Sequence, residues 1–269
     1  MASYVFKSDR NFNDDIESKA FYYVVEHNDL ITKANHDLTA RELKIMDFVI
    51  SKIKPDDKKF NIVETSLYEL NKILGLTRTG KNYSDMAETI GTLRKKEVLI
   101  YDEQERTVTQ TGWVESAKYH ESGKVEIRLS SELTPYLLEL KKDYTQYLLF
   151  DTVQLNSKYS ILLYKLMREA DKNKGESMPV LETSPEQLQK QLGSPESYTF
   201  GEFNRNVLKP AIEEINLKIN DMNLTVLQGR RGRKVVALKI RNEFYPRKKV
   251  KTDELKVPMI NWLEDDGMQ

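Results

Sequence analysis

The chain has no cysteine, which excludes disulfide bonds and thiolate zinc sites. It has no apolar run near the roughly 20 residues that a membrane helix needs, and residues 1–13 lack the apolar core of a secretory signal. Its three histidines, His27, His36 and His120, are isolated and form no metal-binding pair. We therefore expect a soluble, cytoplasmic protein with no metal, no other cofactor and no membrane partner.

The chain also has no net charge, because 42 Lys and Arg balance 42 Asp and Glu. This balance argues against a uniformly basic coat for nucleic acid, but the charge is unevenly distributed. Ten basic residues and a single acid, Glu243, lie between Gln228 and Lys251. A local concentration of positive charge on a neutral protein suits a polyanion bound at one surface. A solvated charge run is the alternative.

An internal repeat relates the two halves of the chain. Residues 63–75 read VETSLYELNKILG and residues 181–193 read LETSPEQLQKQLG, with seven identical positions at an offset of 118. The same offset aligns the apolar positions of the segments upstream, such as Met46 with Tyr164. Two matches at one offset predict two homologous domains of roughly 100 residues each.

Each half predicts the same order of elements. In the first half, Thr39 and Glu42 form a predicted capping box, and Ser66 is the predicted cap of the second helix. The elements expected are a helix over 40–53, a strand over 60–63, helices over 66–75 and 82–97, and strands over 98–101, 107–117 and 124–129. In the second half, Ser184 and Pro185 predict a capped helix. The elements expected are a helix over 157–172, a strand over 178–181, helices over 184–193 and 200–216, and strands over 224–228 and 234–241. A tight turn at 229–232 is expected to join the last two strands.

Helix, strand, helix, turn, helix and hairpin is the order of a winged helix. The sequence therefore predicts an α+β fold of two tandem winged-helix domains. The expected divisions are an N-terminal arm (1–25), an N-terminal domain (26–142), a linker (143–156), a C-terminal domain (157–246) and a basic, then acidic, tail (247–269). The linker is rich in tyrosine and leucine, so we expect it to be packed.

A helical wheel over 200–216 separates a buried face from a polar face. The polar face carries Arg205, Asn206 and Lys209, with Tyr198 just before the helix. Because arginine pairs with guanine and asparagine with adenine in the major groove, these three residues are predicted to read bases, and Tyr198 is placed beside the DNA backbone. Ordinary solvent exposure is the alternative. Pro210 predicts a kink near Asn206.

The last hairpin and the first domain supply further candidates. The hairpin carries four basic residues at its tip, which predict a phosphate or minor-groove clamp, and two more basic residues follow it: Arg230, Arg231, Arg233, Lys234, Arg247 and Lys248. The third helix of the first domain has charges of both signs, and its hairpin is acidic (Asp102, Glu103 and Glu105). We expect auxiliary DNA contacts from Lys81, Ser84 and Lys95, together with a protein contact made by this domain.

Catalysis is not expected. The segment 75–81 reads GLTRTGK and matches most of a phosphate-binding loop, but Asn82 replaces the Ser or Thr that binds magnesium, and a helix precedes it where a strand is required. The isolated histidines do not suit a metal-dependent nicking enzyme.

Three segments resemble the theta-type, iteron-binding plasmid replication initiator family, in the form found on plasmids of low-GC Gram-positive bacteria. They are NDLITKAN at 28–35, KYSILLYKL at 158–166 and FNRNVLKPAIEEIN at 203–216, which the arginine hairpin follows. Similar proteins carry arginines where this chain has Asn204, Arg205 and Asn206, which adds Asn204 to the base-reading candidates.

The resemblance implies a function that the fold alone does not. In the family that this chain resembles, monomers bind repeated double-stranded origin sites, the iterons, with both domains, and the C-terminal domain is the main reader. Dimers form through the N-terminal domain, repress the initiator's own gene and so influence copy number. The bound initiator helps open the origin and recruits the host replication initiator and helicase. A winged-helix transcriptional regulator and a nucleotide-driven or nicking enzyme are the competing hypotheses.

Overall fold

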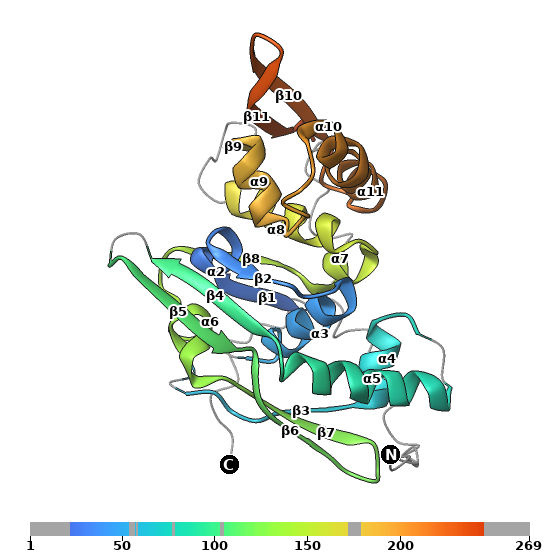
Figure 1. Cartoon of the computed structure of the whole chain (residues 1–269). Helices are drawn as coiled ribbons and strands as arrows, with labels where there is room; N and C mark the ends of the chain where they lie inside the picture. The colour runs from blue at the N-terminus through green and yellow to red at the C-terminus, as the bar shows by residue number, and fades with distance from the viewer. Residues whose placement is uncertain are drawn as a thin grey trace, which may run out of the picture.

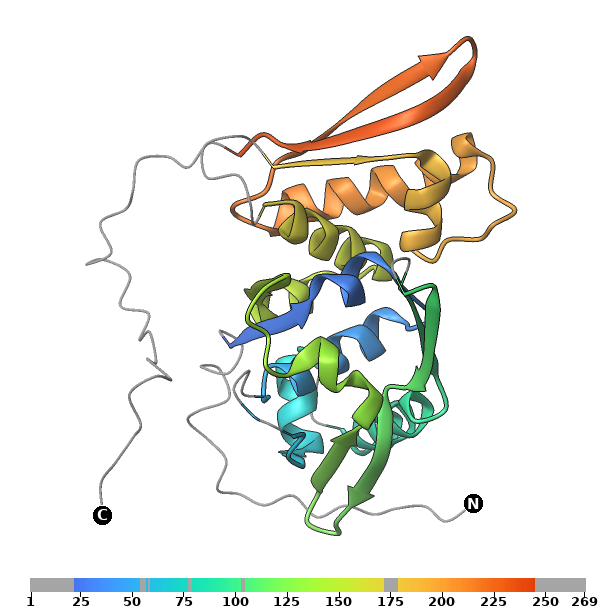
Figure 2. The same cartoon turned by 90° about the vertical axis from the view of Figure 1, so that its left-hand side faces the viewer.

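The computed structural model describes residues 22–53, 57, 59–76, 79–102, 105–171 and 179–244. Two halves are stacked in Figures 1 and 2, with helix α8 (Lys158–Asp171) between them. The predicted tail over 247–269, and all but the last four residues of the predicted arm over 1–25, lie outside the described residues.

The N-terminal half begins with three elements that the sequence did not predict, β1 (Tyr23–His27), α2 (Asn28–Thr32) and β2 (Ala34–His36). Its three main helices are α3 (Ala40–Ile50), α4 (Leu67–Ile73) and α5 (Gly80–Leu93). The capping box of Thr39 and Glu42 is confirmed, and Ser66 caps α4 by accepting a hydrogen bond from the Glu69 N–H. The helix predicted over 82–97 begins and ends earlier, because Thr79 supplies its N-cap and β4 begins at Glu97.

Five strands form two sheets with these elements: β3 (Val63–Ser66), β4 (Glu97–Asp102), β5 (Thr107–Gly112), β6 (Val114–Tyr119) and β7 (Lys124–Leu129). The sheet orders are β2-β4-β5 and β3-β7-β6. The single strand predicted over 107–117 is wrong, because the chain leaves one sheet for the other at Trp113. Trp113 and Val114 are both buried, which breaks the alternation that one continuous strand requires. The strand predicted over 60–63 lies three residues later, as β3.

The connection between the halves is ordered. It contains the 3-10 turn η1 (Ser131–Leu133), α6 (Thr134–Leu137), β8 (Tyr144–Leu148) and α7 (Leu149–Gln154). Strand β8 pairs antiparallel with β1, from Tyr23 opposite Leu148 to His27 opposite Tyr144. The packed linker predicted over 143–156 is thus built of β8 and α7. The boundary expected at residue 25 falls inside β1, because strand pairing with β8 holds residues 23–25 against the domain.

The C-terminal half follows the predicted order of elements. After α8 it contains β9 (Val180–Thr183), α9 (Pro185–Gln191), α10 (Phe200–Phe203), the π-helical turn η2 (Asn204–Leu208), α11 (Lys209–Lys218), β10 (Leu224–Arg231) and β11 (Lys234–Asn242). Ser184 caps α9 and Pro185 stands at its first turn, as predicted. The strand expected over 178–181 begins at Val180, with residue 178 outside the described ranges.

The structure supports the internal repeat at matched positions. Ser66 and Ser184 are both N-caps, and the helices that they begin are both followed by a left-handed glycine, Gly75 at φ +68° and Gly193 at φ +56°. The sheet β3-β7-β6 has the order of β9-β11-β10. Among the residues that the structure describes, the hairpin β4–β5 has no counterpart in the second half, so it is an insertion in the first.

Helix α8 is buried along most of its circumference, with Ser160, Ile161 and Leu163–Met167 all buried. It contacts α2 and α3 of the N-terminal half, β8 of the connection, and β9 and α11 of the C-terminal half. A helix that is buried on several faces lies inside a larger core and not at its surface. None of the helices in the described ranges is long and apolar enough to cross a membrane.

Candidate nucleic-acid interface

The helix formed by α10, η2 and α11 has the two faces that the sequence predicted. Its inner stripe is buried and consists of Phe203, Val207, Leu208, Ala211 and Ile215. Its outer face exposes Arg205, Asn206 and Lys209, while Asn204 is half-buried at the edge of that face. In the helix-turn-helix arrangement this third helix is the one that enters the major groove. Three of the four base-reading candidates thus stand where solvent or DNA can reach them.

Pro210 explains the geometry of this helix. It has no N–H to donate to the carbonyl of Asn206, so the regular ladder is interrupted there. The chain accommodates the interruption with the π-helical turn η2, in which the Lys209 N–H donates to the carbonyl of Asn204, five residues back. The interruption of the helix lies where the kink was predicted, near Asn206, and it includes three of the four candidate base-reading residues, Asn204, Arg205 and Asn206.

The outer face also makes local polar contacts. Arg205 Nε donates to Asn206 Oδ1 at 3.2 Å, and Lys209 Nζ lies 3.8 Å from Glu213 Oε1 one turn on. Glu202 instead completes a capping box with Thr199, and hydrogen bonds from Thr199 lower the pKa of the Glu202 carboxyl. Tyr198 is half-buried just before α10. The weak local contacts of Arg205 and Lys209 leave their charges available to an anionic ligand.

The hairpin β10–β11 is the wing of the C-terminal half and extends away from the rest of the molecule (Figure 2). The turn predicted over 229–232 is wrong. Strand β10 continues to Arg231, which pairs with Lys234, and the turn is Gly232-Arg233 with Gly232 at φ +62°. A left-handed glycine suits so short a turn. The register shifts between Gly229 and Arg230 because a bulge interrupts the pairing there.

The wing tip is strongly positive. Arg230, Arg231, Arg233 and Lys234 are all exposed. Within the described residues, Lys234 alone of these four has a carboxylate within 4.0 Å, Glu186 Oε1 at 3.4 Å. A backbone hydrogen bond at the start of α9, and then Lys234, lower the pKa of Glu186. These four cations, at and beside a two-residue turn, repel one another, and an anion bound there would reduce this repulsion.

The N-terminal half offers a weaker basic surface. Lys81 and Ser84 are exposed on α5, but Lys95 lies in the turn after it, because α5 ends at Leu93. By comparison with β10–β11, the wing of this half is β6–β7, whose residues have both signs, among them Lys118, Glu121 and Arg128. The acidic hairpin of the sequence analysis is therefore the inserted β4–β5 and not the wing. Of its three acids, Glu103 lies outside the described residues.

Two further candidates, Arg247 and Lys248, also lie outside the described residues. Within the described part of the chain, no group of three His, Asp or Glu side chains could hold a metal ion.

The junction of the halves contains polar residues that were not predicted from the sequence, chiefly Lys44, Glu214 and Lys218. Lys218 Nζ contacts Glu214 Oε1 at 2.7 Å and Gln154 O at 2.8 Å, while Lys44 Nζ donates to Val153 O at 2.8 Å. The spacing of Glu214 and Lys218 by four residues was a visible signal of a helical ion pair. No local pattern in the sequence predicts that Glu214 and Lys218 contact the segment 154–157 between the two halves.

Known proteins match both halves of the chain. The family described as Initiator Replication protein, WH1, matches residues 23–168, and the family described as Initiator Rep protein, WH2, matches residues 184–242. A Replication initiation protein from Escherichia coli is 27% identical over 206 residues, which are 74% of this chain and 63% of that relative. The chain thus spans less than two thirds of the length of this curated relative.

The crystal structure of Pi initiator protein in complex with iteron DNA has a TM-score of 0.69 to this chain at 17% identity, over 85% of this chain and 99% of the other. At this identity the likeness establishes the fold, and it confirms two tandem winged helices. The WH1 match alone extends through most of α8 and spans more than half of the 269 residues. The chain therefore belongs to the family of initiator replication proteins, with a WH1 domain followed by a WH2 domain.

Proposed function

We propose that this protein initiates replication of a plasmid by binding repeated double-stranded origin sites, the iterons. The observation that carries the proposal is the basic surface of the C-terminal domain, where an exposed helix face and an extended wing tip gather seven polar or charged candidates: Arg205, Asn206, Lys209, Arg230, Arg231, Arg233 and Lys234. Family membership supports the assignment of this surface to origin DNA. The related Pi initiator was crystallised with iteron DNA.

The two kinds of contact have different tasks. The helix face of Arg205, Asn206 and Lys209, with Asn204 at its edge, reads bases in the major groove. The wing tip and Tyr198 contact the DNA backbone, which sets the register but carries no sequence information. In the N-terminal domain, Lys81, Ser84 and Lys95 add auxiliary contacts. As expected from the sequence, we assign the main recognition of DNA bases to the C-terminal domain.

A footprint on the DNA that flanks the gene tests this proposal. Two winged helices on one face of a duplex read major grooves about 10.5 base pairs apart, so each protected site should span roughly two helical turns and recur in tandem. Protection of a single half-turn would refute the two-domain arrangement. The alternative hypothesis, a transcriptional regulator of the same fold, is tested by placing the gene and its repeat-containing origin on a plasmid. Only a replication initiator would sustain that plasmid.

The finer steps belong to the same proposal. A monomer binds each iteron, and the bound array opens adjacent DNA and recruits the host replication initiator and helicase. Dimers made through the N-terminal domain repress the gene. Recruitment can be separated from binding by measuring how much host helicase is recovered with origin DNA. A variant that binds iterons normally but recovers less helicase would be defective in recruitment alone.

A further inference from the structure

The six-residue helix α7 stands between the two halves, and a lysine from each half contacts its C-terminal end. Lys44 Nζ of α3 donates to Val153 O at 2.8 Å, and Lys218 Nζ of α11 donates to Gln154 O at 2.8 Å. The last carbonyls of a helix have no partner within the helix and carry partial negative charge. One cation from each domain therefore caps the same helix end.

The lysines are close enough to affect each other. Burial lowers the pKa of Lys44, the positive charge of Lys218 lowers it further, and the carboxylate of Glu214 opposes them. Lys44, Lys218 and Glu214 thus form one charged group across the domain junction. Two of its three members belong to α11, which is the C-terminal part of the continuous helix of α10, η2 and α11 that we call the reading helix.

Glu214 fastens the same helix to the start of α8. Its carboxylate accepts hydrogen bonds from the N–H groups of Asn156 at 2.7 Å and Ser157 at 3.2 Å, and from Lys218 Nζ at 2.7 Å. Burial acts to raise the pKa of Glu214, but these hydrogen bonds outweigh it and lower the pKa. The reading helix is therefore bound both to the end of α7 and to the beginning of α8.

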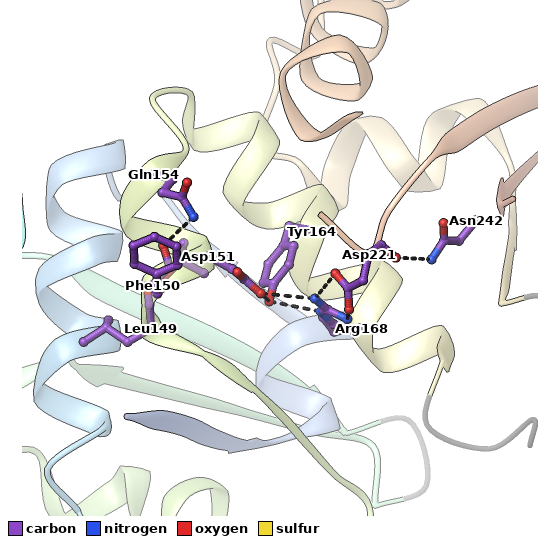
Figure 3. Close-up of polar contacts among 9 residues, drawn as sticks. Leu149, Phe150, Asp151, Gln154, Tyr164, Arg168, Asp221 and Asn242 are labelled. Atoms are coloured by element: carbon purple, nitrogen blue, oxygen red, sulfur yellow. Dashed lines mark hydrogen bonds and ion pairs between the residues drawn. The ribbon is translucent and has the colours of Figure 1, made fainter. Parts of the chain in front are cut away.

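A second set of contacts holds α7 from the wing side (Figure 3). Asp151 Oδ2 accepts from Tyr164 Oη at 2.6 Å and from Arg168 Nη2 at 3.1 Å. Arg168 also makes a two-pronged contact with Asp221, at 2.7 Å for each oxygen. Asp221 lies between α11 and β10, and its carbonyl accepts a hydrogen bond from Asn242 Nδ2 of β11. Arg168 thus joins α7 to the segment that links the reading helix with its wing.

We propose that α7 is a rigid spacer and that Lys44, Lys218 and Arg168 are positioning residues that set the separation between the two DNA contacts of this protein. The inference rests on the proposed function. Inserting one base pair between two grooves rotates one against the other by about 34° and moves it by about 3.4 Å. A rigid connection then matches one separation, whereas a loosened connection accepts several separations with lower affinity for each.

The first arm of the test needs no DNA. Because the chain has no cysteine, spin labels attached at Glu121→Cys in the N-terminal half and Ser197→Cys in the C-terminal half report a single distance within one chain, provided that the labelled protein is diluted with an excess of unlabelled protein. We expect a narrow distance distribution in the otherwise unchanged chain and a broader one after Lys218→Met or Arg168→Met. Lys96→Met is the matched control, because Lys96 is a similarly covered lysine that pairs with Glu42 inside the N-terminal half. Equally narrow distributions in all variants would overturn the inference.

The second arm measures affinity for the footprinted site and for the same site with one base pair inserted at its centre. We expect the insertion to weaken binding by roughly tenfold or more for the unchanged chain and for Lys96→Met, but only by about two- to threefold for Lys218→Met. Lys218→Arg, which keeps a donor and a charge, should restore the strong dependence and also serves if Lys218→Met does not fold. An insertion penalty for Lys218→Met equal to that of the unchanged chain would refute the positioning role. Broadened distances in a chain that binds no iteron would refute the proposed function and leave the spacer role supported.

Discussion

Lys165 of α8 donates a hydrogen bond of 2.7 Å to Asp47 of α3, and the two residues occupy equivalent positions of the internal repeat, 118 residues apart. Contact between equivalent positions is what a two-fold interface has at its axis. Two identical charged residues would repel each other at such a position. In this chain the position is occupied by an acid in the first half, Asp47, and by a base in the second half, Lys165. Lys165 also lies 3.2 Å from Glu26, whose carboxylate accepts a hydrogen bond from Tyr147.

Replacing Lys165 with methionine is expected to lower the free energy of unfolding by about 3–5 kcal/mol, because Asp47 and Glu26 would remain buried without their cation. Urea unfolding followed by circular dichroism measures the change. Lys124→Met is the control, because Lys124 forms an exposed pair with Glu64, and it should have a much smaller effect. If the two variants lose the same small amount of stability, the ion pair of Lys165 and Asp47 does not hold the halves together.

Replacing Arg205 with alanine is expected to weaken binding to an iteron by about 1–3 kcal/mol and to relax the preference at one or two base pairs. The reason is that Arg205 is exposed on the face of the helix that we assign to the major groove. Competition binding with a panel of single-base variants of the site measures both the loss of affinity and the change in base preference. An equal loss of affinity for iteron and unrelated DNA would remove Arg205 from the base-reading set.

Arg231→Ala should weaken binding to all sequences more evenly, because Arg231 lies at the wing tip and is assigned to phosphate. Loss of one phosphate contact should reduce the slope of log affinity against log salt by about one. A titration at several salt concentrations, with Arg205→Ala measured alongside, separates the two roles. A changed base preference with an unchanged salt slope would contradict this assignment.

His36 should make the protein less stable as the pH falls. Burial, and then the charges of Lys165 and Lys158, lower the pKa of His36 from 6.5 to about 4, so the unfolded chain takes up the proton first. Stability from this group is complete above pH 6.5 and declines as the pH approaches 4, by up to about 3 kcal/mol. His36→Asn keeps an acceptor near the Leu38 N–H but cannot titrate, so its unfolding free energy should fall less steeply. Parallel curves for the two proteins would show that His36 does not carry this dependence.

The free protein is expected to form dimers through the N-terminal domain and to bind a single iteron as a monomer, with the two states linked by mass action. The motivation is the contrast between the mixed charges of α5 and β6–β7 and the basic surface of the C-terminal domain. Sedimentation over a concentration series, with and without one iteron duplex, measures both states. A protein that stays monomeric at tens of micromolar, or binds one iteron as a dimer, would contradict the expectation.

Local patterns were sufficient for much of the fold. The repeat at 63–75 and 181–193, the caps at Thr39, Ser66 and Ser184, and the buried stripe of the reading helix all depend on residues close together in the chain. Hydrogen bonds to the first turn of a helix and the 3.6-residue period are local in this way. The tandem winged helices and the exposed face of Arg205, Asn206 and Lys209 followed from them.

The sequence by itself thus determined the main helices of both domains, the caps at Thr39, Ser66 and Ser184, and the polar side of the reading helix. Only the tertiary structure decided that β4–β5 is an insertion and β6–β7 the wing, because strand pairing joins residues as distant as Val63 and Ile127. It also decided that Asp47 meets Lys165 and that Lys44 and Lys218 cap one helix end. Such contacts cross between the two halves, where no periodicity along the chain specifies which polar side chains will be buried together.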